Sequence, residues 1–448
     1  MATGTDTPLA SPAAPASGPI HDRYVRGHRL RDELVLEVHA RPFEALVAPA
    51  RGSHIAIPSN PLEASTAREH MAALCLRYGA PVPSPGANYY SQDLGPFRVR
   101  WEQHTEFTTY TFVRSGPFKE PFADPVIGLV PRDWLDGLNG DALAAIHFAL
   151  EPASTPERDP EALSLLFNGN GLIGSEVTGG HACAWSDLRT HEDGFSRILV
   201  RDVQLSKMQA GRLVQRLLEI NTYRLMALLS LPLAREVSPV IHQLDAKLGA
   251  ITAQLAHSPA GGEKALLDQM SGIAAELERI GAMTSYRFSG TRAYFDIVMA
   301  RLQQIRQNRI EGLQTFSEFL ERRLTPAVNF CVATADRAND LAERMARVGS
   351  LVRARVEVQI EEQNRDVLAS MDRRSNMQFR LQRIVESLSV AAAMYYLLGL
   401  TNYALHALEA AGVHINPELG AGIALPFIAL LVWWILHLAR RALDKEHP

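Results

Sequence analysis

The sequence predicts an α+β protein with a mixed α/β cytoplasmic domain, a long antiparallel helical or coiled-coil stalk, and a C-terminal two-helix transmembrane hairpin. Strand-like segments rich in β-branched and aromatic residues dominate the first half, helical spacing dominates from Ser206, and two charge-free apolar runs lie near the end. The predicted parts are a disordered tail (1–22), the mixed domain (23–204), the stalk (205–387), the hairpin (388–438) and a basic cytoplasmic tail (439–448).

Composition limits the classes of function. The net charge of −4 over 448 residues, without a basic stripe, does not favour nucleic acid as a partner. The 3 cysteines are widely spaced and form neither a disulfide framework nor a zinc motif. Residues 1–20 are rich in Ala, Pro, Ser and Thr and lack the basic and apolar regions of a secretory signal, so the bulk of the chain is expected in the cytoplasm.

The mixed domain is predicted from alternating strand and helix patterns. Helices are expected over 59–79 and 132–151, where apolar residues recur at helical spacing. Strands are expected where runs of β-branched and aromatic residues end at Gly, Pro, Asn or Asp, over 34–43, 97–104, 107–114, 126–131, 181–188 and 195–200.

The stalk is predicted to be helical. Ser206 can cap a helix that Pro232 ends or kinks, and further helices are expected over 234–257, 265–282 and 286–323. From residue 327 one helix, interrupted at most near Gly349, is expected to enter the first apolar run. Its roughly 75 residues would span on the order of 110 Å. Its narrow apolar stripe needs partners, which are the preceding helices, other copies of the chain, or both.

The hairpin is predicted from two runs, 388–408 and 420–438, that contain no Lys, Arg, Asp or Glu. Each is close to the roughly 20 apolar residues that a spanning helix needs. The alternative is a buried helical pair in a soluble core. Basic residues flank the outer ends, while 399–420 carries none, so the positive-inside rule places both termini on the cytoplasmic side of the membrane. In a bacterium this would be the inner (cytoplasmic) membrane.

Chemical motifs are few. The sequence has no phosphate-binding loop, dinucleotide fingerprint, nucleophile elbow or paired-histidine metalloprotease motif, so no enzyme is predicted. Glu37, His39 and Arg41 alternate on one face of the expected first strand, where they could hold a metal, an anion or a nucleotide. The favoured interpretation is structural, with an Arg–Glu pair and a hydrogen-bonded histidine.

Two further clusters combine histidine with carboxylates. One contains Glu102, His104 and Glu106, and the other contains Asp187, His191, Glu192 and Asp193. If the three clusters converged they could bind a divalent cation, the only cofactor that the sequence suggests. The alternative is that the second group is a polar hairpin turn in which Gly194 supplies positive φ.

Several segments carry a resemblance to a known family. "LEVHARPF", "HTEFTTYTF", "LSKMQAGRLVQRLLEINTYRLMAL", "RIEGLQTFSEFLERRL" and "ASMDRR" resemble an uncharacterised bacterial family, a domain of unknown function with a C-terminal membrane anchor. The resemblance covers nearly the whole chain after residue 25. It implies attachment to the lipid bilayer and no established activity.

The architecture also resembles CorA-type magnesium channels, which are homopentamers whose long helices line the pore. Their Gly-Met-Asn hallmark corresponds here to Gly399-Leu400-Thr401-Asn402, which is one residue longer. Asn402 is the one position to which the resemblance assigns a pore role. If the long helices assemble into a closed ring of copies, Asn402 and Thr401 would form polar rings in a pore. Leu381, Ile384 and Leu388 would then form an apolar constriction below them.

Three hypotheses remain at this stage. The first is a membrane-anchored scaffold or sensor that oligomerises through its long helices. The second is a CorA-like homo-oligomeric channel for a divalent cation such as magnesium, with five copies if that resemblance is deep. The third is a membrane-tethered, metal-dependent enzyme built on the histidine and carboxylate clusters.

Overall fold

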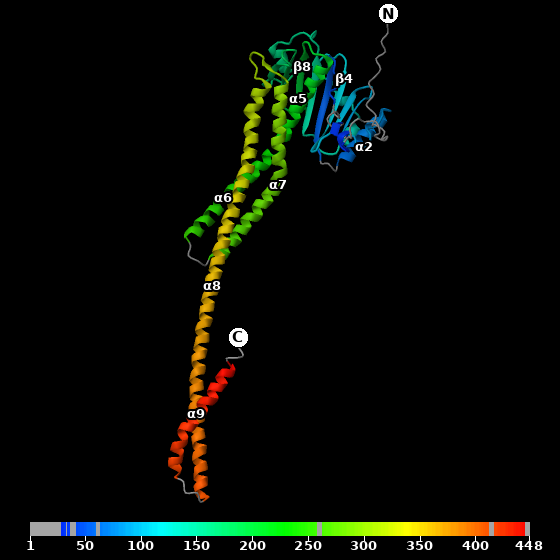
Figure 1. Ribbon diagram of the computed structural model, residues 1–448. Helices are drawn as coiled ribbons and strands as arrows, with labels where there is room; N and C mark the ends of the chain where they lie inside the picture. Colours follow the sequence, from blue (N-terminus) through cyan, green and yellow to red (C-terminus); the bar gives the residue numbers. More distant parts are fainter. Residues whose placement is uncertain are drawn as a thin grey trace. The chain divides into compact units, whose positions relative to one another are not determined.

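The computed structural model of the chain describes residues 28–32, 34–35, 42–59, 63–257, 262–411 and 416–443. These residues form an α+β protein with an N-terminal mixed sheet, a long helix and a shorter terminal helix (Figure 1). The chain divides into two compact units. The first comprises residues 1–250 and 271–345, and the second comprises residues 251–270 and 346–448.

A mixed sheet of nine strands lies at the centre of the first unit in the part of the chain that the structure describes. The strand order is β2-β3-β4-β1-β5-β8-β7-β6-β9, and neighbouring strands are antiparallel except β5 and β8. The strands are β1 (Ala50–Pro58), β2 (Tyr89–Asp93), β3 (Arg98–Gln103), β4 (Phe107–Ser115), β5 (Ala144–Glu151), β6 (Ile173–Val177), β7 (Ala182–Ser186), β8 (Ser196–Asp202) and β9 (Asn308–Arg309).

Helices cover both faces of this sheet. Successive strand residues point to opposite faces, so each face offers side chains against which helices can pack. The short elements are α2 (Ala64–Arg77), the 3₁₀ helix η2 (Val126–Leu129), α3 (Arg132–Asp136) and α4 (Pro160–Leu165). The long ones are α5 (Lys207–Leu228), α6 (Leu231–His257), α7 (Glu263–Gln304), α8 (Phe316–Ala410) and α9 (Pro417–Leu443). α2, η2 and α3 pack on one face through a core that includes Trp101, Phe112 and Trp134.

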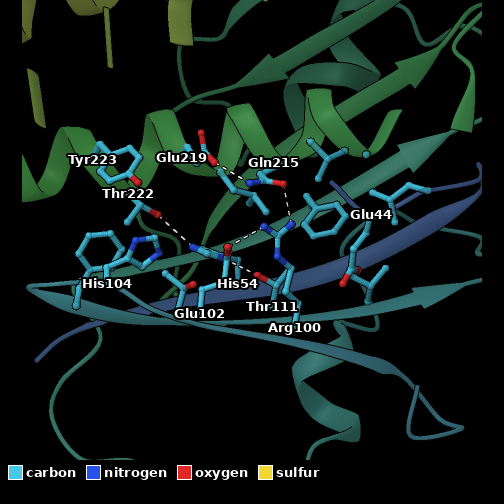
Figure 2. A pocket seen from close by; sticks show the side chains of 18 residues that line it. Glu44, His54, Arg100, Glu102, His104, Thr111, Gln215, Glu219, Thr222 and Tyr223 are labelled. Carbon is cyan, nitrogen blue, oxygen red and sulfur yellow. Dashed lines mark hydrogen bonds and ion pairs between the residues drawn. The ribbon is translucent and has the colours of Figure 1, made fainter. Parts of the chain in front are cut away.

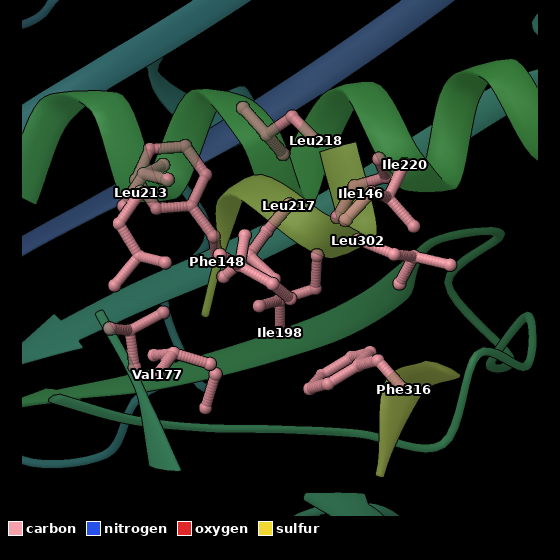
Figure 3. Close-up of a cluster of buried hydrophobic side chains, with 14 of the residues drawn as sticks. Ile146, Phe148, Val177, Ile198, Leu213, Leu217, Leu218, Ile220, Leu302 and Phe316 are labelled. Carbon is pink, nitrogen blue, oxygen red and sulfur yellow. The ribbon is translucent and has the colours of Figure 1, made fainter. Parts of the chain in front are cut away.

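The opposite face packs against α5, α7 and the start of α8. Figure 3 shows Leu213 and Leu217 of α5 above Phe148 and Ile198 of the sheet. The predicted cap of α5 is confirmed, since Ser206 and Gln209 form a capping box. Phe316 at the start of α8 is 1% exposed, so this end of the long helix belongs to the core of the first unit.

Several predicted strands are confirmed and others are wrong. β3, β4, β7 and β8 lie where strands were expected. Residues 126–129 form a 3₁₀ helix instead of a strand, and the flanking Pro125 and Pro131 have no N–H to donate to a sheet. The predicted helix over 132–151 is α3 followed by β5, since the pairing of β5 with β1 and β8 outweighs the helical propensity of its alanines. Leu34 and Val35 are helical, and 36–41 lie outside the described residues.

The helix boundaries also differ from the prediction. α7 continues through residues 283–285, where a break between two helices was expected. The two helices are separated at residues 305–315 instead. Arg306 and Gly312 adopt positive φ there, which ends α7 and turns the chain into α8. α8 contains Pro326 and runs past Gly349 without interruption. The predicted end of the Ser206-capped helix before Pro232 is confirmed, since α5 ends at Leu228 and Pro232 lies in the first turn of α6, a position that tolerates proline.

The second unit has a small core and a long exposed section. Ile251, Met270 and Val352 are buried together with Leu266, and Arg355 Nη1 donates to Leu255 O at 2.6 Å. From residue 353 to residue 411 no side chain of α8 is buried within the chain. The apolar side chains of this section therefore need a partner other than the chain's own described residues.

Candidate functional site

A polar pocket lies between α5 and the sheet in the first unit (Figure 2). Its floor consists of two cross-strand rows. Thr111 of β4 stands between Arg100 of β3 and His54 of β1 in one row, and Thr109 pairs with Glu102 in the next. Its roof is the face of α5 that carries Gln215, Glu219 and Thr222, which lie three or four positions apart. The pocket therefore joins residues that are far apart in the sequence.

The rim of the pocket is formed by the segment that precedes β1. This segment crosses α5 at Gly211, where Leu46 N donates to Lys207 O at 3.0 Å. A Cβ atom at Gly211 would lie 1.7 Å from Glu44 O, so only glycine allows this approach. Glu44 and Leu46 thereby reach the pocket, and Tyr89 Oη donates to Glu44 at 3.2 Å.

Arg100 is the central cation of the pocket. Its Nη2 donates to Glu102 Oε1 at 2.8 Å and its Nη1 donates to Gln215 Oε1 at 2.7 Å. Burial alone lowers the pKa of the guanidinium, but the Glu102 carboxylate beside it raises the pKa above its ordinary value. Gln215 donates in turn to Glu219 at 2.8 Å, and Glu219 forms an ion pair with Arg301 of α7. The network ties the sheet to two helices.

His54 is neutral in this environment. Burial lowers its pKa to about 3, and the positive charge of Arg100 acts in the same direction. Its Nδ1 lies 2.8 Å from Thr111 Oγ1 and its Nε2 lies 3.2 Å from Thr222 Oγ1. A neutral imidazole donates through one nitrogen and accepts through the other, which the two hydroxyls can match.

Two buried polar atoms that face the pocket lack a hydrogen-bond partner. They are Nε of Arg100 and Oγ1 of Thr109, in residues that are 7% and 4% exposed. A buried polar group without a partner costs about 1 to 3 kcal/mol, so such groups are uncommon in folded proteins. Both can donate, so each could serve a hydrogen-bond acceptor bound in the pocket.

The pocket is small and slightly acidic. Its volume of about 50 Å³ corresponds to three to five water molecules, at roughly 10 to 15 Å³ each. Arg100 faces Glu44, Glu102 and Glu219, of which Glu102 and Glu219 already have cationic partners. The remaining charge favours a neutral or cationic occupant over an anion.

The structure separates the histidine clusters predicted from the sequence. Glu102 and His104 both line the pocket, and His104 stacks on Phe107 with ring centroids 4.2 Å apart. His191 lies elsewhere, with its Nε2 3.0 Å from Asp187 Oδ2. The turn that contains Gly194 has the predicted positive φ of 83°. Glu37, His39 and Arg41 lie outside the described residues.

The divalent-cation hypothesis gains no site from this arrangement. Within the ranges that the structure describes, no three His, Cys, Asp or Glu side chains are placed to hold a metal ion together. The acidic partners are engaged in other contacts. Glu106, for example, accepts from Tyr294 Oη at 2.9 Å.

A serine–histidine–aspartate arrangement also occurs and does not form a hydrolase site. Ser53 Oγ lies 2.9 Å from His147 Nδ1, and His147 Nε2 lies 3.7 Å from Asp193 Oδ2. Ser53 is 0% exposed and its Oγ accepts from Ile127 N at 3.1 Å, so no substrate reaches it. The three residues stabilise the sheet and its adjoining loops.

Most of the pocket residues were not recognised in the sequence. His54 lies in β1, which was not predicted. Gln215, Glu219 and Thr222 lie on a helix that was predicted from its Ser206 cap, without a role for its polar residues. Polar residues at positions 215, 219 and 222 of an otherwise apolar stripe were the available signal. The alternation of Arg100 with Glu102 was a second one.

The predicted pore residues all lie on α8 in the second unit. Leu381, Ile384 and Leu388 are 64%, 65% and 71% exposed, and Asn402 is exposed as well. Thr401 Oγ1 donates to Leu397 O at 2.8 Å within the helix. A ring of these residues requires several copies of the chain, so their role in a pore stays a prediction.

Comparison with known proteins gives one match. The sequence model of a family described as "Protein of unknown function (DUF3422)" matches residues 26–443. No curated protein and no solved structure matches the chain. The resemblance to an uncharacterised family is thus confirmed, while the resemblance to CorA-type channels has no support.

Proposed function

Since the chain belongs to the DUF3422 family, whose function is unknown, we propose a function from its pocket and its exposed helices. The protein is a membrane-anchored sensor whose cytoplasmic α+β domain binds a small polar molecule. The observation that carries the sensing role is the pair of buried, unpartnered polar atoms, Arg100 Nε and Thr109 Oγ1, at one pocket. Natural proteins accept such a cost mainly at functional sites.

The membrane anchor is supported by two helices that are long and apolar enough to cross a bilayer. In the apolar 18-residue stretch of α8, 0% of the residues are buried inside the structure. In the corresponding stretch of α9, 6% of the residues are buried. Soluble core helices bury such surfaces, whereas lipid-facing helices expose them. The two helices contact each other at Gly420, where a Cβ atom would lie 3.0 Å from Leu405 Cδ1. Small residues at such a crossing let membrane helices approach.

The orientation follows from charge. Basic residues flank the hairpin on the outer sides, and the positive-inside rule keeps such flanks in the cytoplasm. They are Arg373, Arg374, Arg380 and Arg383 before the first span, and Arg440, Arg441 and Lys445 after the second. We propose that both termini and the pocket domain are cytoplasmic. The exposed apolar residues of α8 below the span, including Leu381 and Ile384, fit association with further copies of the chain.

The ligand of the pocket is a molecule of a few non-hydrogen atoms that presents a carbonyl or another acceptor to Arg100 and Thr109. The acidic rim excludes a simple anion and tolerates an amino group near Glu44. Acetamide, acetate and ethylammonium are suitable probes, because they are similar in size and differ in charge and in their capacity to accept a hydrogen bond. Acetamide is expected to bind best.

We expect Thr109→Val to stabilise the ligand-free protein by about 1 to 2 kcal/mol, because it removes a buried hydroxyl that lacks a partner. Thr111→Val is the matched control on the same strand and face. Its hydroxyl bonds His54 Nδ1 at 2.8 Å, so its loss should destabilise by a similar amount. Denaturant unfolding of the full chain in detergent measures both.

The same variants test ligand binding. Ligand-observed NMR should detect acetamide on the wild type and lose it on Thr109→Val. The sensor proposal fails if none of the three probes binds, or if Thr109→Val lowers stability and leaves binding unchanged.

We expect the full-length chain, expressed in a bacterial host, to stay in the membrane pellet after alkaline carbonate extraction. Leu398→Arg should reduce the pelleted fraction, because a charge near the centre of a span costs about 2.5 to 3.5 kcal/mol. Leu368→Arg introduces the same charge on the same helix outside the span and should leave the fraction unchanged. Release of the wild type by carbonate would refute the anchor.

A further inference from the structure

A second cavity lies in the first unit, away from the pocket beneath α5. It is enclosed by residues 171–173, by the turn that follows β7, by the end of α5 and by residues 312–324 at the start of α8. Its volume of about 470 Å³ falls in the range of ligand pockets, roughly 300 to 1,000 Å³. The cavity therefore has room for a molecule larger than the one that fits beneath α5.

The charge of this cavity is strongly positive. Arg189, Arg224 and Arg323 line it with one carboxylate, Asp187. Asp187 is already engaged, since it accepts from Asn170 Nδ2 at 2.8 Å and from Arg189 N at 3.2 Å. Among the described residues no carboxylate forms an ion pair with any of the three arginines.

Arg224 is the most constrained of the three. Its Nε donates to Asn221 Oδ1 at 2.6 Å and its Nη2 donates to Leu188 O at 3.1 Å, which fixes the guanidinium at the cavity wall. Burial lowers its pKa to about 10, so the group is still charged at neutral pH. Asp187 favours the charged form of Arg224 from a distance but forms no direct ion pair with it, so a bound anion would offset part of the cost of burying this cation.

We propose that this cavity binds an organic phosphate. Three guanidinium groups and one carboxylate leave a net charge of about +2, which matches the charge of about −2 on a phosphomonoester. Guanidinium groups also match phosphate oxygens in shape. The organic part would contact Phe319, Leu320 and Leu228, which line the same space. The occupant would therefore touch the first turns of α8.

The test uses the full chain in maltoside detergent and phenyl phosphate as the probe, measured by calorimetric titration. Phenyl phosphate should bind to the wild type. Arg323→Gln should weaken binding roughly tenfold to a hundredfold, the usual range for one charged hydrogen bond. Arg322→Gln changes the neighbouring exposed arginine, which does not line the cavity, and should bind like the wild type.

A second variant and two further compounds complete the test. Arg224→Met should abolish binding, and if it fails to fold, the surface variant Arg323→Gln still decides. Inorganic phosphate and benzyl alcohol should each bind at least tenfold more weakly than phenyl phosphate. Equal binding of either compound, equal loss in Arg322→Gln, or no binding of phenyl phosphate would overturn the proposal. Thr109→Val should leave phenyl phosphate binding intact, which separates this cavity from the pocket beneath α5.

Discussion

Replacing Arg100 with methionine should lower the free energy of unfolding by about 3 to 5 kcal/mol, the usual loss when one member of a buried ion pair is removed. Arg100 and Glu102 side chains are only 8% and 12% exposed, and their charged atoms lie 2.8 Å apart. Methionine fills a similar space but leaves the Glu102 carboxylate uncompensated and Gln215 Oε1 without its donor. The loss comes mainly from that stranded charge.

The exposed pair of Arg77 and Asp133 is the matched control. Its charged atoms lie 2.6 Å apart, but the side chains are 50% and 72% exposed. Water screens the charges of such an exposed pair, so Arg77→Met should change stability little. A double variant, Arg100→Met with Glu102→Leu, should recover most of the loss. Equal effects of Arg100→Met and Arg77→Met would show that solvent screens the buried pair.

This pair also shows what the sequence could and could not reveal. Position 102 was identified from its alternation with His104 along one strand, and the strand itself was predicted correctly. Its partner, Arg100, lies two positions earlier in the same strand. The helix above it, α5, was predicted from its Ser206 cap. Local patterns therefore gave the elements on both sides of the pocket.

The pocket itself depends on pairing between distant strands. β1 contributes His54 only because it pairs with β4 on one side and β5 on the other. Neither the strand order nor the crossing at Gly211 leaves a local trace in the sequence. The same limit explains the wrong helix over 132–151, where long-range pairing decided the conformation of β5.

Acid should destabilise the protein steeply, because two buried histidines resist protonation in the folded state. Burial lowers the pKa of His54 to about 3 and that of His147 to about 4, against 6.5 in the unfolded chain. Below pH 6.5 the unfolded state binds these protons and the folded state does not, so stability falls as pH falls. Between pH 7 and pH 5 the loss should be about 2 kcal/mol for each histidine.

Other charges around the two rings do not reverse this sign. Arg100 and His104 oppose protonation of His54 together with burial. Asp193 favours protonation of His147, but burial outweighs it, and Arg197 and His191 oppose it as well.

Denaturant unfolding at pH 7, 6 and 5 measures the effect. His54→Gln and His147→Gln should each remove about 2 kcal/mol of the dependence between pH 7 and pH 5. His181→Gln alters an exposed histidine and serves as the control.

A variant at position 54 with the pH dependence of the wild type would mean that His54 takes up its proton while the protein is folded. The Thr111 and Thr222 hydroxyls would then both accept from the ring, and the pocket beneath α5 would carry a positive charge at mildly acidic pH. In that case a cationic occupant would be disfavoured there, and acetate would replace acetamide as the expected probe.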